Sequence, residues 1–140
     1  MMNSIAVPET VRPFLEDNKA NHGFCPVCTK ETWFVERDSW LRDSYECNTC
    51  GSIPRQRALL NTMNTFAPNW CNLKIHESSP DGVSSDFIKS KSAFYSDSHF
   101  TPKVPTGEMH NGFRNENISA LTFDDASFDL FISQDVMEHV

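Results

Sequence analysis

The sequence of 140 residues predicts an α/β protein with two parts, a small cysteine-rich ribbon and a doubly wound parallel sheet. Two Cys-x-x-Cys pairs, separated by eighteen residues, indicate the ribbon. After residue 71, short apolar segments alternate with turn clusters and one helical pattern, and the last segment is almost continuously apolar. That alternation is typical of a parallel sheet buried on both faces. For a chain of this length, we expect a metal-stapled module plus a small or incomplete second unit.

The cysteines of the two pairs predict a structural zinc site; they are Cys25, Cys28, Cys47 and Cys50. Each pair forms a tight turn that directs two thiolates at one point, and tetrahedral Zn²⁺ prefers four such soft ligands. Residues 31–46 have room for one β-hairpin between the pairs, which is the layout of a zinc ribbon. A redox pair or two disulfides are the alternatives. A redox motif needs no second pair, however, and nothing in the sequence marks a secreted chain.

The distribution of charge disfavours nucleic acid as a partner. The net charge is −7, and residues 22–57 carry five Lys or Arg against five Asp or Glu, whereas residues 71–140 carry five against eleven. Nucleic-acid binding is usually supported by clustered Lys and Arg, and no such cluster is present. The N-terminus lacks the charged and apolar regions of a signal peptide, and no segment is long enough to span a bilayer. The sequence therefore predicts a cytoplasmic protein without a membrane partner.

The predicted organisation has four segments. Residues 1–21 form a loosely ordered lead-in, 22–53 the zinc ribbon, 54–70 a linker helix and 71–140 the α/β unit. Leu59, Met63 and Phe66 recur at helical spacing in the linker. Arg55 and Arg57 lie at its start, and two roles stay open for them: solvated or carboxylate-paired side chains, or contacts with phosphate or substrate.

Within the α/β unit, strands are expected at 73–77, 93–96 and 128–133, a helix at 83–89, and a loop at 101–115. Ligands of parallel sheets bind at the carboxyl ends of the strands, where the strand order reverses. Residues at these ends are therefore candidates for binding; they are Glu77, Ser78, Gly82, Asp97, Glu116, Asn117, Gln134, Asp135, Glu138 and His139. The alternative for each acid or Asn is a helix cap or a turn residue.

The C-terminal segment carries a recognisable series of residues: Asn117 four residues before Leu121-Thr122-Phe123, then a turn, then Phe128-Asp129-Leu130 and the pair Glu138-His139. With this series the segment resembles part of the class I S-adenosylmethionine-dependent methyltransferases, in particular the type 11-like group. In that family this segment runs from the adenine-contacting turn through the fourth strand. The resemblance is specific over residues 117–140 and extends more weakly back to Leu73. A four-cysteine ribbon before such a domain also resembles a subset of these proteins.

The resemblance implies a partial Rossmann-like sheet, S-adenosylmethionine as cofactor, and methyl transfer to an unidentified O or N acceptor. It assigns the methionine end of the cofactor to Glu77, Ser78 and Gly82, the ribose to Asp97, the adenine to Asn117, and the region of the methyl group to Gln134, with Glu138 or His139 as candidate base. Two departures weaken the match. Only Gly82 is glycine in the motif at 77–82, and Asn117 replaces the usual Asp. Glu138 and His139 could instead belong to the first turn of a helix.

The family's domain continues beyond the fourth strand, so the chain is expected to be an N-terminal fragment whose strand 128–133 forms an exposed edge. We expect self-association, or pairing with a partner chain, through that edge and no methyl transfer by these residues alone. The alternative function is a zinc-ribbon interaction module with a non-catalytic Rossmann-like remnant. A nucleic-acid-binding ribbon is a further alternative.

Overall fold

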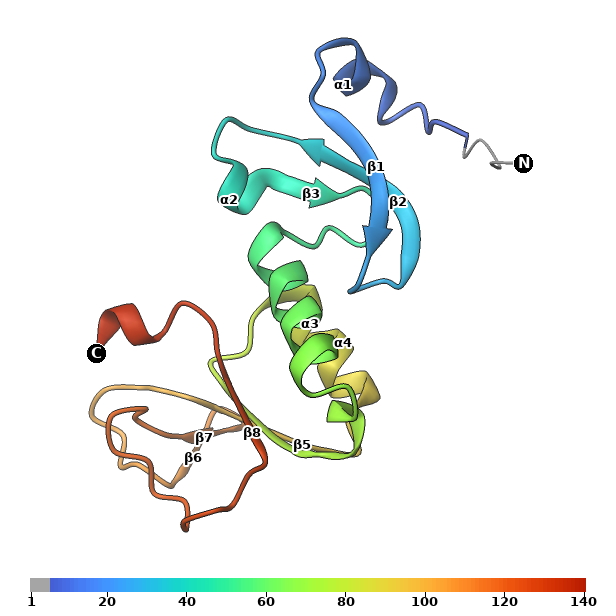
Figure 1. Cartoon of the computed structure of the whole chain (residues 1–140). Helices are drawn as coiled ribbons and strands as arrows, with labels where there is room; N and C mark the ends of the chain where they lie inside the picture. The colour runs from blue at the N-terminus through green and yellow to red at the C-terminus, as the bar shows by residue number, and fades with distance from the viewer. Residues whose placement is uncertain (1–5) are drawn as a thin grey trace. The chain divides into compact units, whose positions relative to one another are not determined.

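The computed structural model describes residues 6–140, which form two compact units divided between Thr62 and Met63 (Figure 1). The boundary lies within helix α3, Pro54–Phe66, which begins where the sequence predicts it. The units are an antiparallel sheet of three strands with a cysteine cluster and a mixed sheet of five strands with helices. The predicted mixed α/β class is therefore confirmed. Among residues 6–140, no helix is both long enough and apolar enough to cross a bilayer.

The first unit is built on a three-stranded antiparallel sheet in the order β1-β2-β3. Its elements are α1 Arg12–Glu16, β1 Ala20–Cys25, β2 Lys30–Glu36, α2 Leu41–Ser44 and β3 Tyr45–Cys47. Strands β2 and β3 are the hairpin predicted between the cysteine pairs, and Phe34 lies opposite Cys47 in its register. Strand β1 adds a third strand, and Cys25 lies opposite Lys30.

The predicted loose lead-in is wrong for its described part. Val11 is fully buried, α1 follows it, and β1 already begins at Ala20, opposite Val35. The backbone N–H of Glu36 also donates to the carbonyl of Lys19, 2.8 Å away. This order comes from pairing with β2, a distant segment that a scan for local periodicity does not detect.

The two arginines of α3 bind groups of the first unit. Arg57 is 9% exposed, and it donates to the carbonyl oxygens of Ser52 and Tyr45, while its guanidinium lies 4.6 Å from the centre of the Phe34 ring. Burial lowers the pKa of Arg57, and neighbouring cysteines oppose this shift. Arg55 pairs with Asp43 at 2.5 Å. Arg57 therefore ties the start of α3 to strand β3.

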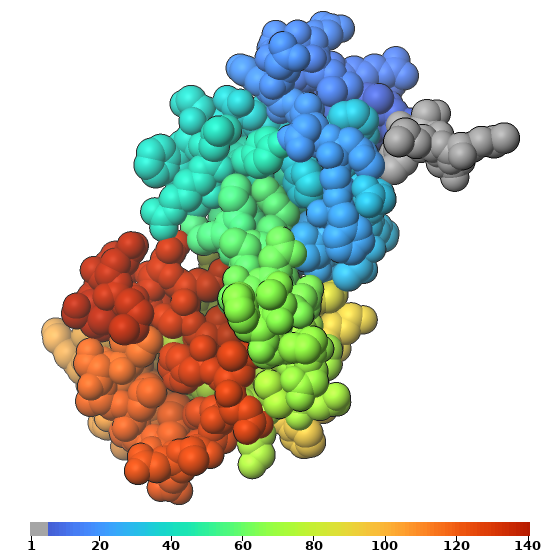
Figure 2. Space-filling model, in the orientation of Figure 1, coloured from blue at the N-terminus to red at the C-terminus, as the bar shows by residue number. Residues whose placement is uncertain are grey.

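The second unit holds a five-stranded sheet in the order β6-β7-β5-β4-β8. Its elements are η1 Trp70–Asn72, β4 Lys74–Ser78, α4 Gly82–Lys91, β5 Phe94–His99, β6 Met109–His110, β7 Phe113–Asn115, β8 Leu130–Ser133 and η2 Met137–His139. All neighbouring strands are parallel except β6 and β7. In Figure 2 the C-terminal segment, coloured orange to red, forms a continuous area on the visible face of this unit.

Strand β4 lies between β5 and β8 in the sheet and buries polar side chains. Ile75, His76 and Glu77 are at most 1% exposed, and Ser78 is also buried. The ring of His76 bridges two serines of β5, with Nδ1 2.8 Å from Ser96 Oγ and Nε2 2.9 Å from Ser98 Oγ. The His76 ring and the Glu77 carboxylate are tolerated in the core because both are hydrogen-bonded.

Most predicted elements differ from the structure by one to four residues at an end, and the differences at β5 and in the segment 101–115 result from strand pairing. Strand β5 continues through Ser98 and His99 because these residues pair with β7. The predicted loop at 101–115 in fact contains β6 and β7, which are joined by Asn111-Gly112 with φ of 50° and 84°. Both angles are positive, as in the two-residue turn that favours Asn-Gly, so this dipeptide was the signal for the hairpin.

Candidate functional site

The four cysteine side chains of the first unit converge on one point. Their Sγ atoms all lie within 4.8 Å of one another, and the Cys25–Cys50 and Cys28–Cys47 pairs are each 3.8 Å apart. A disulfide would need about 2.05 Å, and the cysteines are free thiols. Four sulfurs around one Zn²⁺, each about 2.3 Å from it, would be separated by about 3.8 Å. The spacing therefore fits a single tetrahedral metal ion.

The surroundings of the cysteines shift their pKa values in different directions. The hydroxyl of Ser52, itself fully buried, lies 3.4 Å from Cys25 Sγ and 3.3 Å from Cys50 Sγ. Burial acts to raise the pKa of Cys47, but hydrogen bonds from the backbone of Cys50 and Thr49 outweigh it and lower the pKa to about 7. For Cys28, burial and the neighbouring cysteines raise the pKa. Groups that hydrogen-bond to metal ligands, as Ser52 does here, hold those ligands in position for the metal.

In the second unit, the predicted residue Glu77 forms the centre of a buried network at the carboxyl end of β4. Its carboxylate accepts hydrogen bonds from Ser85 of α4 at 2.8 Å, Tyr95 of β5 at 2.6 Å and Gln134 after β8 at 3.3 Å. Burial, and then the Glu77 carboxylate, raise the pKa of Tyr95, so the phenol keeps its proton and remains a donor. Glu77 thus joins three elements at the strand ends.

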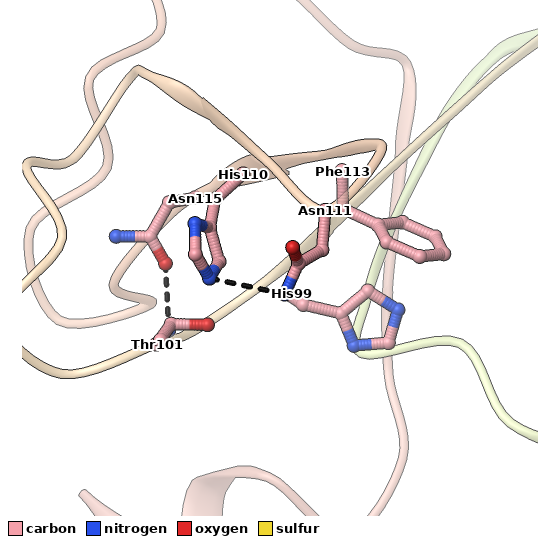
Figure 3. A pocket seen from close by; sticks show the side chains of 6 residues that line it. All are labelled: His99, Thr101, His110, Asn111, Phe113 and Asn115. Atoms are coloured by element: carbon pink, nitrogen blue, oxygen red, sulfur yellow. Dashed lines mark hydrogen bonds between the residues drawn. The ribbon is translucent and has the colours of Figure 1, made fainter.

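Several cavities lie beside these strand ends, and the predicted binding residues line different ones. Gly82 and Asp97 line a cavity of about 170 Å³ with Lys89, whose Nζ lies 3.5 Å from Asp97 Oδ2. Ser78, Asn117 and His139 line another cavity, of about 270 Å³. A cavity of about 230 Å³ lies between the end of β5 and the β6–β7 hairpin (Figure 3). The structure therefore separates Asp97 from Asn117 rather than placing them in one cavity.

The turn that carries Asn117 is held by its neighbour, Glu116. Glu116 is 2% exposed and accepts hydrogen bonds from Arg114 at 2.6 Å and from the hydroxyl of Thr122 at 2.6 Å. Burial acts to raise the pKa of Glu116, but these hydrogen bonds outweigh it and lower the pKa. The side-chain oxygen of Asn117 accepts from the backbone N–H of Ser119 at 2.9 Å. Asn117 is therefore already engaged in a local turn, as the alternative interpretation of this residue expects.

The proposed catalytic pair lies at the surface. Glu138 and His139 belong to the short helix η2, and their side chains are 56% and 74% exposed. Glu138 Oε1 and His139 Nε2 lie 3.5 Å apart, so the two side chains contact each other. Only His139 of the pair lines the cavity that contains Asn117. The predicted α-helical turn is instead a single 3₁₀ turn.

The ends of β4 and β8 carry two further features that sequence reasoning missed. Ser133 Oγ and Gln134 Oε1 are buried without a hydrogen-bond partner among the described residues. Ser79 and Asp135, each just past the end of its strand, have φ of 54° and 51°. Unsatisfied buried atoms and left-handed backbone at non-glycine residues cluster at ligand sites in proteins. No feature of the sequence identifies them, because both depend on packing.

Comparisons with models of protein families, with curated proteins and with solved structures find no match to this chain.

Proposed function

We propose that the first unit is a zinc ribbon and that the second unit binds S-adenosylmethionine as part of a methyltransferase-like domain. In the ribbon, Cys25, Cys28, Cys47 and Cys50 hold one Zn²⁺. Four protein ligands leave no open position for water, so the metal has a structural role and no catalytic one. The 3.8 Å spacing between sulfurs supports this proposal.

The observation that carries the second proposal is the strand order. In the strand order, β5 and β7 follow on one side of β4, and the chain then returns to place β8 on the other side of β4. In open parallel sheets, ligands bind in the crevice outside the carboxyl ends of the strands where the order reverses in this way. Here that point lies between β4 and β8, where Glu77 and Gln134 meet. A Rossmann-like sheet is therefore our interpretation of this unit.

Polar residues at the reversal point, and on the neighbouring segments around β5 and β7, are candidates to contact the groups of the cofactor. Ser133 Oγ and Gln134 Oε1 are buried and unsatisfied, a feature that clusters at ligand sites, although neither residue lines a described cavity. Asp97 offers a carboxylate for a ribose diol and Asn117 an amide for adenine. The cofactor, when bound, supplies an electrophilic methyl group. The chain's own residues would orient it, and His139 lines the cavity beside Asn117 as the candidate base.

The second candidate function is an interaction module with a non-catalytic remnant. It is favoured by the division of Asp97 and Asn117 between two cavities, and by the surface position of Glu138 and His139. Titration calorimetry of the zinc-loaded chain with S-adenosylhomocysteine separates the two. We expect one ligand to bind per chain. A folded, zinc-loaded chain that releases no heat with either S-adenosylhomocysteine or S-adenosylmethionine would favour the interaction module.

A further inference from the structure

The cavity between β5 and the β6–β7 hairpin has a lining unlike that of the other cavities. Its volume is about 230 Å³, and its lining residues are His99, Thr101, His110, Asn111, Phe113 and Asn115 (Figure 3). None of them is Asp, Glu, Lys or Arg, although the chain as a whole carries a net charge of −7. The wall offers neither the carboxylates that bind cations nor the Lys and Arg that bind anions. Its chemistry favours an uncharged ligand.

Aromatic rings form one corner of this cavity. The rings of His99 and Phe113 have centroids 4.2 Å apart and planes inclined by 76°. A flat guest can stack on one of two such rings and present its edge to the other, which are the two favoured arrangements for aromatic pairs. Pockets for drug-sized ligands have about 300–1,000 Å³, so this smaller cavity suits one ring system.

The polar groups of the lining are partly fixed and partly available. Asn115 is fully used, because its oxygen accepts from the backbone of Thr101 at 2.6 Å and its amide donates to the carbonyl of Val104 at 2.8 Å. Asn111 Nδ2 lies 3.1 Å from His110 Nε2. The oxygen of Asn111 and the ring nitrogens of His99 make no hydrogen bond among the described residues. These groups can therefore accept from and donate to a ligand.

We propose that this cavity binds a neutral, planar heteroaromatic ring with donors and acceptors along its edge, the chemistry of a purine or pyrimidine base. The ring stacks in the corner of His99 and Phe113 and hydrogen-bonds to Asn111. This site goes beyond the proposed cofactor site. It shares no lining residue with the cavity that contains Asn117, and only His99 and Phe113 with the one that contains Asp97.

The test is a titration of the zinc-loaded full chain with the free bases adenine and cytosine, followed by NMR of the histidine Cε1–H resonances. The chain has five histidines, so the other three act as internal references. We expect the resonances of His99 and His110 to shift saturably, with a dissociation constant on the order of 1 mM or lower. Those of His22, His76 and His139 should stay in place.

Two variants locate the ring within the cavity. Phe113→Leu removes the stacking surface and should weaken binding at least about fivefold, since one stacked base contributes about 1–3 kcal/mol. Asn111→Gly removes the hydrogen-bonding side chain but tolerates the positive φ of 50°, so the hairpin is kept, and binding should weaken about tenfold. The matched control is Met109→Leu on the same hairpin, which is 69% exposed and outside the lining, and it should bind like the unaltered chain.

Three results would overturn the proposal. In the first, neither base shifts His99 or His110 at about 10 mM while the chain stays folded. In the second, the base shifts His139 and leaves His99 and His110 in place, which would put the ring in the cavity that contains Asn117. In the third, inorganic phosphate alone reproduces the shifts, which would make the cavity an anion site. Absence of S-adenosylhomocysteine binding would count against the proposed function only, because the base titration does not depend on it.

Discussion

The hydroxyl of Tyr95 lies 2.6 Å from Oε2 of Glu77, so a partly buried hydrogen bond to a carboxylate joins the neighbouring parallel strands β5 and β4. Glu77 is 1% exposed, and its carboxylate also accepts a hydrogen bond from Ser85 of α4. A buried acid of this kind costs folding free energy unless its partners are in place. The network therefore couples the fold of the sheet to the position of the strand ends where ligands of such sheets bind.

Tyr95→Phe should lower the free energy of unfolding by about 1.5–3 kcal/mol, because it removes one donor from a buried carboxylate. Urea unfolding monitored by circular dichroism measures the change. Tyr45→Phe makes the same chemical change at a hydroxyl without a hydrogen bond among the described residues, and it should cost less than about 0.5 kcal/mol. Equal effects of the two substitutions would contradict the role assigned to Tyr95.

The purified chain should contain one Zn²⁺, and Cys47→Ser should bring the zinc content close to zero because three ligands bind the ion far more weakly. Metal analysis by mass spectrometry measures the ratio. Cys71→Ser is the matched control, since Cys71 is a free cysteine outside the cluster, and it should retain one ion per chain. A chain with no metal and four reactive thiols would rule out the zinc site.

If the second unit binds S-adenosylmethionine, Asp97→Ala should weaken binding at least about tenfold, or about 1.4 kcal/mol. The carboxylate can accept from both ribose hydroxyls, and its loss leaves both without that partner. Calorimetry compares this variant with Asp125→Ala, which removes an exposed acid that lines none of the described cavities. Unchanged affinity of Asp97→Ala would show that the ribose lies elsewhere.

The sequence predicted those parts of the structure that depend on local spacing. The Cys-x-x-Cys pairs predicted the cysteine cluster, and the helical spacing of Leu59, Met63 and Phe66 predicted α3, although Phe66 is 82% exposed and only Met63 of the three is buried. Strand β5 was predicted too short because its last residues are the polar Ser98 and His99, which belong to the strand through pairing with distant segments, Ser98 with β4 and both with β7. The turn dipeptide Asn111-Gly112 did carry a signal for the missed hairpin.

The candidate site in the second unit was less predictable, because its contacts join distant segments. Glu77 and Asp97 could be placed near strand ends by pattern alone. The hydrogen bonds of Glu77 to Tyr95 and to Gln134 depend on the order of the strands, since Gln134 lies fifty-seven positions away in the sequence. Local pattern also cannot tell that Asp97 and Asn117 line different cavities, since this depends on side-chain packing around β5.

Stability of the second unit should fall as the pH drops below about 6.5, the usual pKa of histidine. Burial lowers the pKa of His76, while Asp97 and Glu116 oppose this shift and Arg114 adds to it. The unfolded chain therefore binds a proton at a pH where the folded chain does not, which destabilises the fold by at most about 1.4 kcal/mol per pH unit. Above this pH both states are neutral, and His76 adds no dependence.

Urea unfolding at several pH values measures this effect in a Trp33→Phe, Trp40→Phe background, in which the remaining Trp70 reports on the second unit. Zinc is kept saturating so that protonation of the cysteines in the other unit is limited. His22→Ala should leave the fall in stability unchanged, whereas His76→Phe should reduce it. A profile of His76→Phe that matches the parent would exclude His76 as the cause.

The outer edge of β8 should make the chain self-associate. β8 pairs with β4 on one side, from Leu130 opposite Ile75 to Ser133 opposite Ser78, and no described strand pairs with its other side. Its four residues carry no charge and no proline, and Phe131 is 37% exposed, so the edge lacks two of the features that usually prevent pairing. Phe131→Lys adds such a charge and should shift the sedimentation coefficient towards the monomer, whereas Met137→Lys, which alters an exposed residue outside the strand, should not. A parent chain that sediments as a monomer at every concentration would contradict this prediction.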